Sequence, residues 1–301
     1  MLPFVSVVVP HLNQTEALAS CIRSLDAQSY PRDRMEWIVV DNGSRCDLAT
    51  LRERHPDVIL LAEPQPGPGL ARNRGVAAAR GEILAFIDAD CRAHEDWVRT
   101  LVDAIAGQDG LGPVGGDVRI DVGNAERLTA LESYESVFAY RQRLYIERHG
   151  YSGTGNLAMA PEIFTRVGPF GGIAIAEDAD WGKRSAAAGR PLSYVPGMIV
   201  YHPARALFSQ LQAKWRRHVA HQLETHRAAG KSDLAWLMLA VAVLLSVVPH
   251  TFRMLVSDRL SGARNRLRGL PVLLRIRWYR FGEMLRQARH AESAAADWNR
   301  V

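Results

Sequence analysis

The residues whose types and spacing best suit chemistry are Asp88 and Asp90, which follow a short apolar run. Ile83 to Ile87 is wholly apolar and comes shortly after Gly81, a pattern typical of a strand buried on both faces of a parallel sheet. Two neighbouring carboxylates repel each other unless a proton or a cation lies between them. Because Mg²⁺ is usually held by one or two carboxylates and phosphate oxygens, the pair predicts a metal site that grips a substrate diphosphate. The alternative is a solvated turn.

A second group of acids stands where a predicted helix begins. Glu177, Asp178 and Asp180 are followed by Trp181. Acidic residues in a first helical turn are often no more than partners of the helix dipole. Three acids and a tryptophan so close together exceed that need, so the group favours a functional role.

Three further polar side chains carry weaker signals, each with a structural alternative. Asp41 follows a predicted strand as Asp88 does, but a turn-forming aspartate that bonds its own backbone is the simpler interpretation. Arg72 and Arg74 follow a glycine-rich loop and have planar donors that suit phosphate, although a solvated helix face explains them equally well. His202 follows another predicted strand, where a lone histidine is usually structural.

The elements that would position these side chains alternate regularly. Strands are predicted at 4–9, 36–40, 58–61 and 83–87, and helices from about 15, at 70–79 and at 94–106. This order predicts right-handed βαβ units and a parallel sheet, with Pro10 ending the first strand. Ligands of such sheets bind at the carboxyl ends of the strands, where Asp41, Asp88 and Asp90 fall. Neither common nucleotide-loop signature is present, so a nucleotide would be bound by another scheme.

The second half of the chain is less regular. The pattern predicts one long helix over 124–148 and strands at 192–195 and 198–201, with a flexible turn at 152–156. The aromatic face of the long helix is interpreted as core rather than as a sugar-stacking platform; it consists of Tyr134, Phe138 and Tyr145.

The composition suits one large domain or one domain with an appendage. The chain has 301 residues, 48% of them hydrophobic, so it can bury a full core. Its three scattered cysteines fit neither a disulfide framework nor a zinc site, which favours a reducing compartment. No secretory signal is expected, because residues 4–9 read as a strand with no basic region before them. The net charge of +5 suits nucleic acid, anionic lipid or a phosphorylated substrate.

Residues 234–252 form an apolar segment without Asp, Glu, Lys or Arg. At about 19 residues it is just long enough to span a bilayer. Arginine-rich stretches flank both ends, and the positive-inside rule would place both in the cytoplasm. One span cannot satisfy that rule, so a re-entrant or interfacial helix with its basic tail on anionic lipid is favoured. A buried helical hairpin or a dimer contact is the alternative.

Six stretches, in matching order and spacing, resemble the family-2 inverting glycosyltransferases of the GT-A fold. They are Ser6–Pro10 with Asn13, Ile38–Ser44, Gly69–Gly75, Phe86–Asp90, Gly155–Ala158 and Glu177-Asp178. The resemblance covers roughly residues 4–205. It implies an α/β fold with a GT-A-type, mostly parallel nucleotide-binding sheet flanked by helices. The catalytic domain would span 1–205, and a basic helical, membrane-associated region would span 206–301.

On the donor side, the resemblance implies that Pro10 and Asn13 line the nucleotide pocket and that Asp41 contacts the base. Arg72 would lie by the donor, and Asp88 would contact the donor sugar or ribose. The donor would be a nucleotide-sugar, with UDP as the family default rather than a deduction.

For catalysis, the resemblance implies a Mg²⁺ or Mn²⁺ ion that is bound by Asp88 and Asp90 and also by the diphosphate of the donor. His202 would be a further metal ligand. The metal would neutralise charge on the departing diphosphate. Asp178, supported by Glu177, would take the proton of the acceptor hydroxyl as that oxygen attacks the anomeric carbon from the opposite face. Neighbouring acidic charges would raise the pKa of this base.

The acceptor would be a hydroxyl of a glycan or of a lipid-linked molecule. The candidates for the acceptor side are the 152–156 turn, with Gly155 and Asn156, and Trp181.

The sequence departs from the family pattern at two places. His11 and Leu12 stand where members often have Thr and Tyr. The Gln-x-x-Arg-Trp motif of processive synthases is not reproduced, because Leu211 occupies the matching position before Lys214-Trp215. The second departure favours transfer of a single sugar.

The predicted function is a metal-dependent inverting glycosyltransferase of the hexosyltransferase type (EC 2.4) in polysaccharide biosynthesis. It would act at the cytoplasmic face of the inner or plasma membrane, whether peripheral, re-entrant or single-span. The alternatives are an inactive membrane-surface scaffold and a nucleotidyltransferase, which should show a basic glycine-rich loop where Pro10–Asn13 stands. A nucleic-acid partner is disfavoured because the positive charge lies beside an apolar segment. A homodimer is left open.

Overall fold

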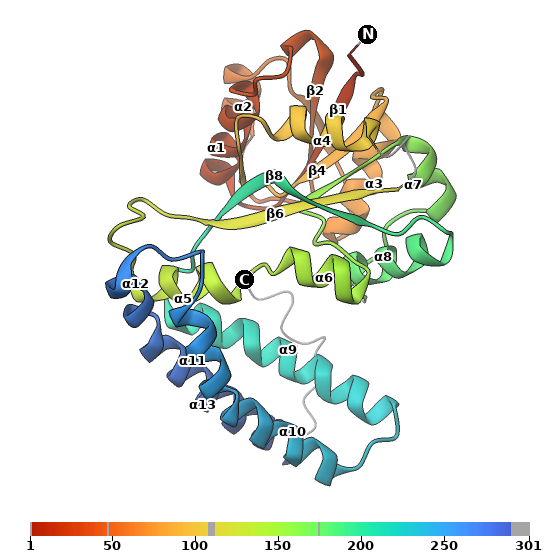
Figure 1. Ribbon diagram of the computed structural model, residues 1–301. Helices are drawn as coiled ribbons and strands as arrows, with labels where there is room; N and C mark the ends of the chain where they lie inside the picture. The colour runs from red at the N-terminus through yellow and green to blue at the C-terminus, as the bar shows by residue number, and fades with distance from the viewer. Residues whose placement is uncertain (1, 47, 108–111, 174, 290–301) are drawn as a thin grey trace. The chain divides into compact units, whose positions relative to one another are not determined.

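The computed structural model describes residues 2–46, 48–107, 112–173 and 175–289 (Figure 1). Contacts within the chain define two compact units. The sheet unit comprises Met1–Asp121 and Tyr140–Pro203, and the helical unit comprises Val122–Ala139 and Ala204–Val301. Residues 122–139 therefore group with the C-terminal helices, although they lie within the range predicted for the catalytic domain.

One mixed sheet organises the described part of the sheet unit, in the strand order β3-β2-β1-β4-β7-β6-β8-β5 (Figure 1). The strands are β1 (Val5–His11), β2 (Met35–Asp41), β3 (Ile59–Ala62), β4 (Ile83–Ile87), β5 (Arg92–Ala93), β6 (Val114–Asp121), β7 (Asn156–Met159) and β8 (Ser193–Pro203). β3, β2, β1 and β4 run parallel, as predicted. β7 is antiparallel to β4 and β6, β6 and β8 are parallel, and β5 is antiparallel to β8.

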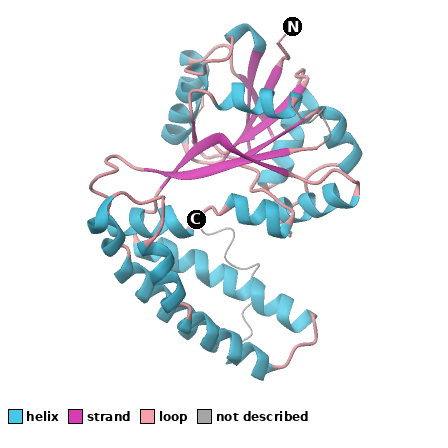
Figure 2. Ribbon diagram, viewed as in Figure 1, coloured by secondary structure: helices cyan, strands magenta, loops and turns pink. Residues whose placement is uncertain are grey.

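Helices cover both faces of this sheet (Figure 2). They are α1 (Thr15–Asp26), α2 (Ala49–Arg54), α3 (Pro68–Ala78), α4 (Trp97–Ala106), α6 (Gln142–His149), α7 (Pro161–Val167) and α8 (Glu177–Ala187), with a 3₁₀ turn, η1, at Arg32–Arg34. Side chains alternate along β1. Val7 and Val9 join the core with α1 and α4, whereas Val8 joins the core with α3 and α8. Burial on both faces explains why the first strands are almost wholly apolar.

Pro10 does not end the first strand, contrary to the prediction. β1 continues to His11, and Pro10 pairs with Val40 of β2. The neighbour on the other side, β4, pairs with β1 only from Val5 to Val8. Proline is tolerated here because no strand lies beside its nitrogen to require an N–H donor.

The predicted single helix over 124–148 is wrong. The structure has α5 (Ala130–Phe138) and, after a break, α6. Tyr140, in the break, has a φ of 47°, outside the right-handed helical region. The aromatic residues predicted on one face are therefore divided between the units, with Tyr134 and Phe138 in the helical unit and Tyr145 in the sheet unit.

The two strands predicted at 192–195 and 198–201 are one long strand, β8, which begins at Ser193. The pairing of β6 with β8 shifts register between Gly116 and Asp117, and such an irregularity leaves backbone groups unpaired. The Asn156 side chain satisfies two of them, because its Nδ2 donates to the carbonyl oxygens of Asp117 (2.8 Å) and Met198 (2.9 Å).

The helical unit is built around its long last helix. Besides α5, its helices are α9 (Phe208–Ala228), α10 (Asp233–Leu245), α11 (Val247–Leu255), α12 (Gly262–Arg268) and α13 (Leu270–Arg289). α13 packs against α9, α10 and α11. Trp236 of α10 is buried beside Val219 and Met284, and its Nε1 donates to the Met284 carbonyl oxygen (3.0 Å).

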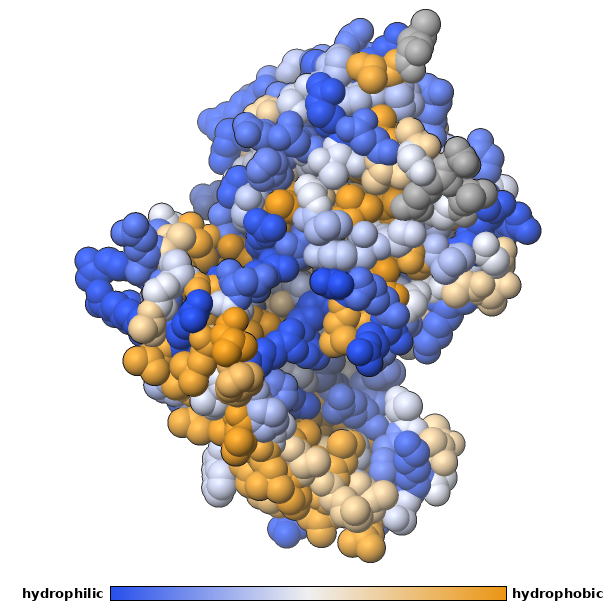
Figure 3. All heavy atoms as spheres, viewed as in Figure 1, coloured by the Kyte–Doolittle hydropathy of each residue, from blue (hydrophilic) through white to orange (hydrophobic). Residues whose placement is uncertain are grey.

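The apolar segment predicted at 234–252 forms two consecutive helices, α10 and α11, that meet at Ser246. Asp233–Leu255 is long and apolar enough to cross a membrane by length and composition, with a mean hydropathy of 2.0. Within this range, only 11% of the most apolar 18-residue stretch is buried inside the protein. Figure 3 shows the apolar side chains gathered at the surface of the helical unit.

Candidate active site

The paired aspartates lie directly beyond the carboxyl end of β4, as predicted. Ligand atoms of Asp88, Asp90 and Cys91 all lie within 4.8 Å of one another. The Sγ of Cys91 donates to the Asp90 Oδ1 (3.8 Å). Burial, followed by the charges of the two aspartates, raises the pKa of the Cys91 thiol well above its usual value. A protonated thiol is a poor ligand for a hard cation, so the two carboxylates are the groups here that suit Mg²⁺ or Mn²⁺.

His202 reaches the same site from β8. Its Nε2 lies 3.2 Å from the Asp90 Oδ2 and 2.9 Å from the hydroxyl oxygen of Tyr140. Its Nδ1 lies 2.8 Å from the Pro203 carbonyl oxygen, so Nδ1–H donates there. Nε2–H donates to Asp90 when the ring is protonated, whereas Nε2 carries a lone pair when the ring is neutral, which is the form that binds a metal. Histidines that bind metals typically donate their other ring N–H in this way. The position and tautomer of His202 therefore fit a third metal ligand.

The histidine and the aspartate tune each other. Burial alone would lower the pKa of His202, but the hydrogen bond and charge of Asp90 raise it overall. Burial alone would raise the pKa of Asp90, but the contact with His202 lowers it overall. Asp90 therefore stays ionised, as a cation ligand must.

Arg72 joins the aspartate pair to the acids of α8. Its Nη2 donates to the Asp88 Oδ1 (2.6 Å), and its Nη1 donates to the Glu177 Oε1 (3.1 Å). The side chain is only 3% exposed, and its Nε is buried with no hydrogen-bond partner among the described residues. The segment that carries Arg72 is closely packed. At Gly69 only a glycine fits, because a Cβ there would lie 2.2 Å from the Gly171 carbonyl oxygen.

Asp178 lies in the first turn of α8, immediately after Glu177. Burial raises its pKa first, and the Glu177 charge raises it further, whereas the Ala179 N–H and Arg72 oppose the shift. Asp180 points its carboxylate to the Arg184 Nε (2.8 Å) instead. Asp178 and Asp180 thus have different environments, because Asp180 is paired with Arg184 whereas the pKa of Asp178 is raised.

The carboxyl ends of β1 and β2 form a second polar cluster. The Nδ1 of His11 lies 3.2 Å from the Asp41 Oδ1 and 3.2 Å from the Ser44 Oγ. The backbone N–H of Asn13 donates to the same Ser44 Oγ (2.8 Å). Asn13 has a φ of 56°, a conformation that asparagine tolerates better than most residues. The cluster thus includes Asn13 and Asp41, both predicted for the nucleotide side, and Pro10 precedes its His11 in the sequence.

Two asparagines that fix the site were missed by the sequence prediction. Asn42 donates to the carbonyl oxygens of Glu63 and Gln65 and accepts from the Gly67 N–H. Asn73 exchanges two hydrogen bonds with the backbone of Phe170. Both lie in motifs already singled out, next to Asp41 and Arg72, but their partners are remote in sequence.

The residues predicted for the acceptor side differ in how close they lie to the aspartate pair and in how deeply they are buried. A Cβ at Gly155 would lie 2.4 Å from the Asp88 Oδ2, so this backbone lies directly against the aspartate. Asn156 is fully buried; it bridges strands as described above and accepts from the Trp97 Nε1 (2.9 Å). Trp181 is also buried, with its Nε1 donating to the Gly168 carbonyl oxygen (2.9 Å). Because the side chains of Asn156 and Trp181 are both buried, they stabilise the surrounding structure and have no exposed surface for a ligand to contact.

Comparison with known proteins identifies the family of the chain. The profile described as "Glycosyl transferase family 2" matches residues 6–171. The chain belongs to glycosyl transferase family 2. Its relatives include the glycosyltransferase AglE of Haloferax volcanii, which is 34% identical over 221 residues, covering 71% of this chain and 72% of AglE. The uncharacterized glycosyltransferase YibD of Escherichia coli is 32% identical over 101 residues, covering 32% of this chain and 29% of YibD.

Solved structures show that this family 2 chain has the GT-A fold. The mannosyltransferase PcManGT of Pyrobaculum calidifontis, in complex with GDP-Man and Mn²⁺, superposes with a TM-score of 0.61 at 19% identity. That match covers 97% of this chain and 89% of PcManGT. GalNAc-T7, with UDP, GalNAc and Mn²⁺, gives a TM-score of 0.54 at 20% identity, covering 68% of this chain and 44% of GalNAc-T7. The predicted family and fold are confirmed, and the family 2 chain is a transferase enzyme.

Proposed function

We propose that this family 2 enzyme is a metal-dependent, inverting glycosyltransferase. It moves one sugar from a nucleotide-sugar to a hydroxyl of a glycan or lipid-linked acceptor. The observation that carries the proposal is the bridge through Arg72, which joins Asp88 of the aspartate pair to Glu177 beside Asp178. A metal-binding group and a base with a raised pKa are thereby held in one rigid site within the sheet unit.

The aspartate pair and His202 are the proposed metal site. Both oxygen ligands are carboxylates, and the imidazole presents its Nε2 to Asp90. Mn²⁺ accepts this mixed set of oxygen and nitrogen ligands, and Mg²⁺ prefers the oxygens. The two GT-A structures described above were solved with Mn²⁺. A bound divalent cation would supply positive charge that stabilises the departing diphosphate.

The protein's own groups would carry out the proton transfer. Asp178 accepts the proton of the acceptor hydroxyl, and that oxygen attacks the anomeric carbon from the face opposite the leaving diphosphate, which inverts the configuration. Arg72 holds Glu177, so that the neighbouring carboxylate stays in place and keeps the pKa of Asp178 raised. The cluster of Asn13 and Asp41 would receive the nucleotide, with UDP as the first candidate.

The test is donor binding, measured by thermal shift. UDP-, GDP- and dTDP-sugars are added in turn to the purified chain in mild detergent, with Mn²⁺, with Mg²⁺ or with EDTA. A ligand at 100 times its dissociation constant adds about 2.7 kcal/mol of stability, so one nucleotide class should raise the melting temperature in a metal-dependent way. A folded protein that responds to none of these donors with metal present would identify it as an inactive scaffold.

The exposed apolar side chains of α10 and α11 form a stripe, and we propose that it docks on an anionic membrane surface. Leu234, Met238, Leu245, Val248 and Phe252 are each at least 64% exposed. Their spacings of four, seven, three and four residues place them along one side of a continuous helical path. The opposite side, with Trp236 and Ala240, is buried against the helical unit.

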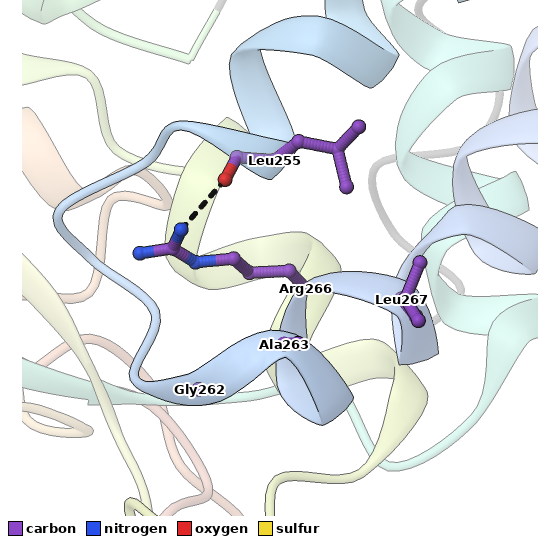
Figure 4. Close-up of a pocket in the computed structure, with 5 residues that line it drawn as sticks. All are labelled: Leu255, Gly262, Ala263, Arg266 and Leu267. Atoms are coloured by element: carbon purple, nitrogen blue, oxygen red, sulfur yellow. Dashed lines mark hydrogen bonds between the residues drawn. The ribbon is translucent and has the colours of Figure 1, made fainter.

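Charge next to the stripe favours anionic lipid. Arg253 directly follows Phe252, and Arg264 and Arg268 lie in α12, which packs against α11; all three are exposed. Basic residues beside an inserted apolar face are typical of interfacial helices. A hollow of about 360 Å³ at the end of α11 is lined by Leu255 and Leu267 (Figure 4). Arg266 closes one side of it by donating to the Leu255 carbonyl oxygen (2.8 Å). The hollow belongs to this docking surface rather than to the active site, whose residues all lie in the sheet unit.

Vesicle sedimentation tests the membrane proposal. The protein should sediment with vesicles that contain anionic lipid and much less with neutral ones. The double variant Val248→Ser/Phe252→Ser, at two side chains of the stripe that are 74% and 68% exposed, should bind at least about tenfold more weakly because it loses inserted apolar area. The control is Leu2→Ser in the sheet unit. Equal binding of both variants, or no binding of the wild type to either vesicle, would contradict the proposal.

A further inference from the structure

Two tyrosines of the sheet unit form a stacked pair that the roles assigned so far do not use. Tyr145 lies in α6, and Tyr151 follows directly after this helix ends at Gly150. Their ring centroids are 5.4 Å apart and the ring planes differ by 8°. Both residues are partly exposed, unlike the fully buried aromatic residues of the two sheet cores. The pair therefore presents ring surface beyond what core packing requires.

The stacked pair lies against the helix that carries the proposed base. A Cβ at Gly182 would lie 2.5 Å from the Cβ of Tyr151 and 2.6 Å from the Gly150 carbonyl oxygen. Gly182 is four residues after Asp178, so the two share one face of α8. The missing side chain at Gly182 thus lets Tyr151 pack onto the face of α8 from which Asp178 projects.

The segment after Tyr151 leads to the aspartate pair. Gly155, four residues later, lies directly against Asp88, as described above. The segment between them is fixed, because Gln142 of α6 accepts from the Gly153 N–H (3.1 Å) and the Ser152 hydroxyl donates to the Gly153 carbonyl oxygen (3.1 Å). One short, ordered stretch therefore runs from the aromatic pair beside the base to the carboxylate on the donor side.

We propose that Tyr151, supported by Tyr145, is the platform on which a sugar ring of the acceptor stacks. The electron-rich face of an aromatic ring attracts the slightly positive C–H groups that line one face of a pyranose. The place of the pair beside Asp178 would bring a hydroxyl of that sugar to the base. The acceptor is accordingly a carbohydrate, rather than a lipid phosphate without a sugar. This inference rests on the proposed function and specifies its acceptor.

The phenol of Tyr151 is suited to this role. Burial, followed by the charges of Tyr145 and Asp178, raises its pKa to about 12. It therefore stays protonated and neutral at physiological pH, so that no phenolate competes with Asp178 for the proton of the acceptor hydroxyl.

The experiment uses the whole chain, with UDP and Mn²⁺ present, and methyl and octyl glycopyranosides as probes. Saturation-transfer NMR measures their binding without turnover, and donor thermal shift is recorded in parallel. Tyr151→Leu keeps an apolar side chain but removes the aromatic face, so it should weaken glycoside binding about tenfold or more. Tyr151→Phe should bind nearly as the wild type does. Tyr194→Leu, at a half-buried tyrosine of β8, is the matched control.

The parallel readouts separate this inference from the function on which it rests. A wild-type protein that shows no nucleotide shift but binds glycosides through Tyr151 would refute the donor site and support the acceptor platform. Wild-type protein that keeps the shift but binds no glycoside, or binds farnesyl phosphate in its place, overturns the inference. Unchanged glycoside binding in Tyr151→Leu overturns it as well.

Discussion

Replacing Asp178 with asparagine is expected to reduce sugar transfer by about 10²- to 10⁴-fold, the usual contribution of a general base. Asparagine keeps the size and one oxygen of the side chain but cannot accept the proton of the acceptor hydroxyl. Because Arg72 contacts Glu177 and Asp88 rather than Asp178 itself, the donor site should remain formed. Transfer assays alongside donor thermal shift check both parts, and an unchanged donor shift is required.

The matched control for this variant is Asp180→Asn. Asp180 is two residues away on the same helix turn, but its carboxylate is bound by Arg184. Its removal should leave transfer within a few-fold of the wild type. If both variants lost activity equally, the effect would reflect disruption of α8, and Asp178 would not be the base.

The raised pKa of Asp178 sets the expected pH dependence. Its causes are burial and Glu177, which both disfavour the charged form. As the pH falls to this raised pKa, Asp178 becomes protonated and the transfer rate of the wild type should decline. The residual rate of the Asp178→Asn variant should not show this decline. Rate profiles of the two proteins over mildly acidic to neutral pH would show this difference.

The same shift predicts the sign of the stability change. Between the unfolded and folded pKa values, the folded protein binds more protons than the unfolded one, so stability falls as the pH rises through that window. Above it, the ionised Asp178 is a cost to the folded state. Asp178→Asn should therefore be at least as stable as the wild type at neutral pH, and the difference should disappear in acid. A less stable variant at neutral pH would contradict this account.

The sequence was sufficient for features that depend on local pattern. The apolar runs of β1, β2 and β4 identify parallel strands buried on both faces. Asp41 ends β2, and Asp88 and Asp90 lie just beyond β4. The carboxyl ends of parallel strands meet at one edge, so these acids could be placed together without a structure. The family resemblance then connected them to Glu177 and Asp178 in α8.

Features that depend on distant pairs could not be read from the sequence. Arg72 and Glu177 are 105 residues apart, and nothing local distinguishes a buried bridging arginine from one on a solvated helix. Asn156 was assigned to the acceptor side by its motif, but the register shift between β6 and β8 requires its amide in the core. Register shifts are set by tertiary pairing, which a single sequence does not reveal.

The aromatic residues of 124–148 show the same limit. Their helical spacing suggested one continuous core face, whereas Tyr140 adopts a positive φ and ends the helical path. That conformation brings its hydroxyl to His202. A strained backbone of this kind persists only where the surrounding contacts hold it, and those contacts come from β8, far along the chain.

Replacing Asp90 with asparagine is expected to cost at least about 10²-fold in transfer, similar to the loss of one electrostatic stabiliser of a transition state. Of the two aspartates, Asp90 is the better probe. Asp88 is already engaged by Arg72 at 2.6 Å, so its removal would also release a buried cation and confuse the result. Asp90 is bonded to His202, itself a proposed ligand, and asparagine preserves the shape of the side chain while removing its charge.

The variant should also change the metal requirement, which separates a ligand from a structural residue. The Mn²⁺ concentration that gives half-maximal donor thermal shift should rise, and excess Mn²⁺ should restore part of the shift. Without metal, wild type and variant should behave alike. Asp57→Asn, at a carboxylate whose side chain is 84% exposed, is the control and should follow the wild type throughout. A variant at Asp90 that kept the wild-type metal titration would remove Asp90 from the metal site and contradict the proposed ligand set.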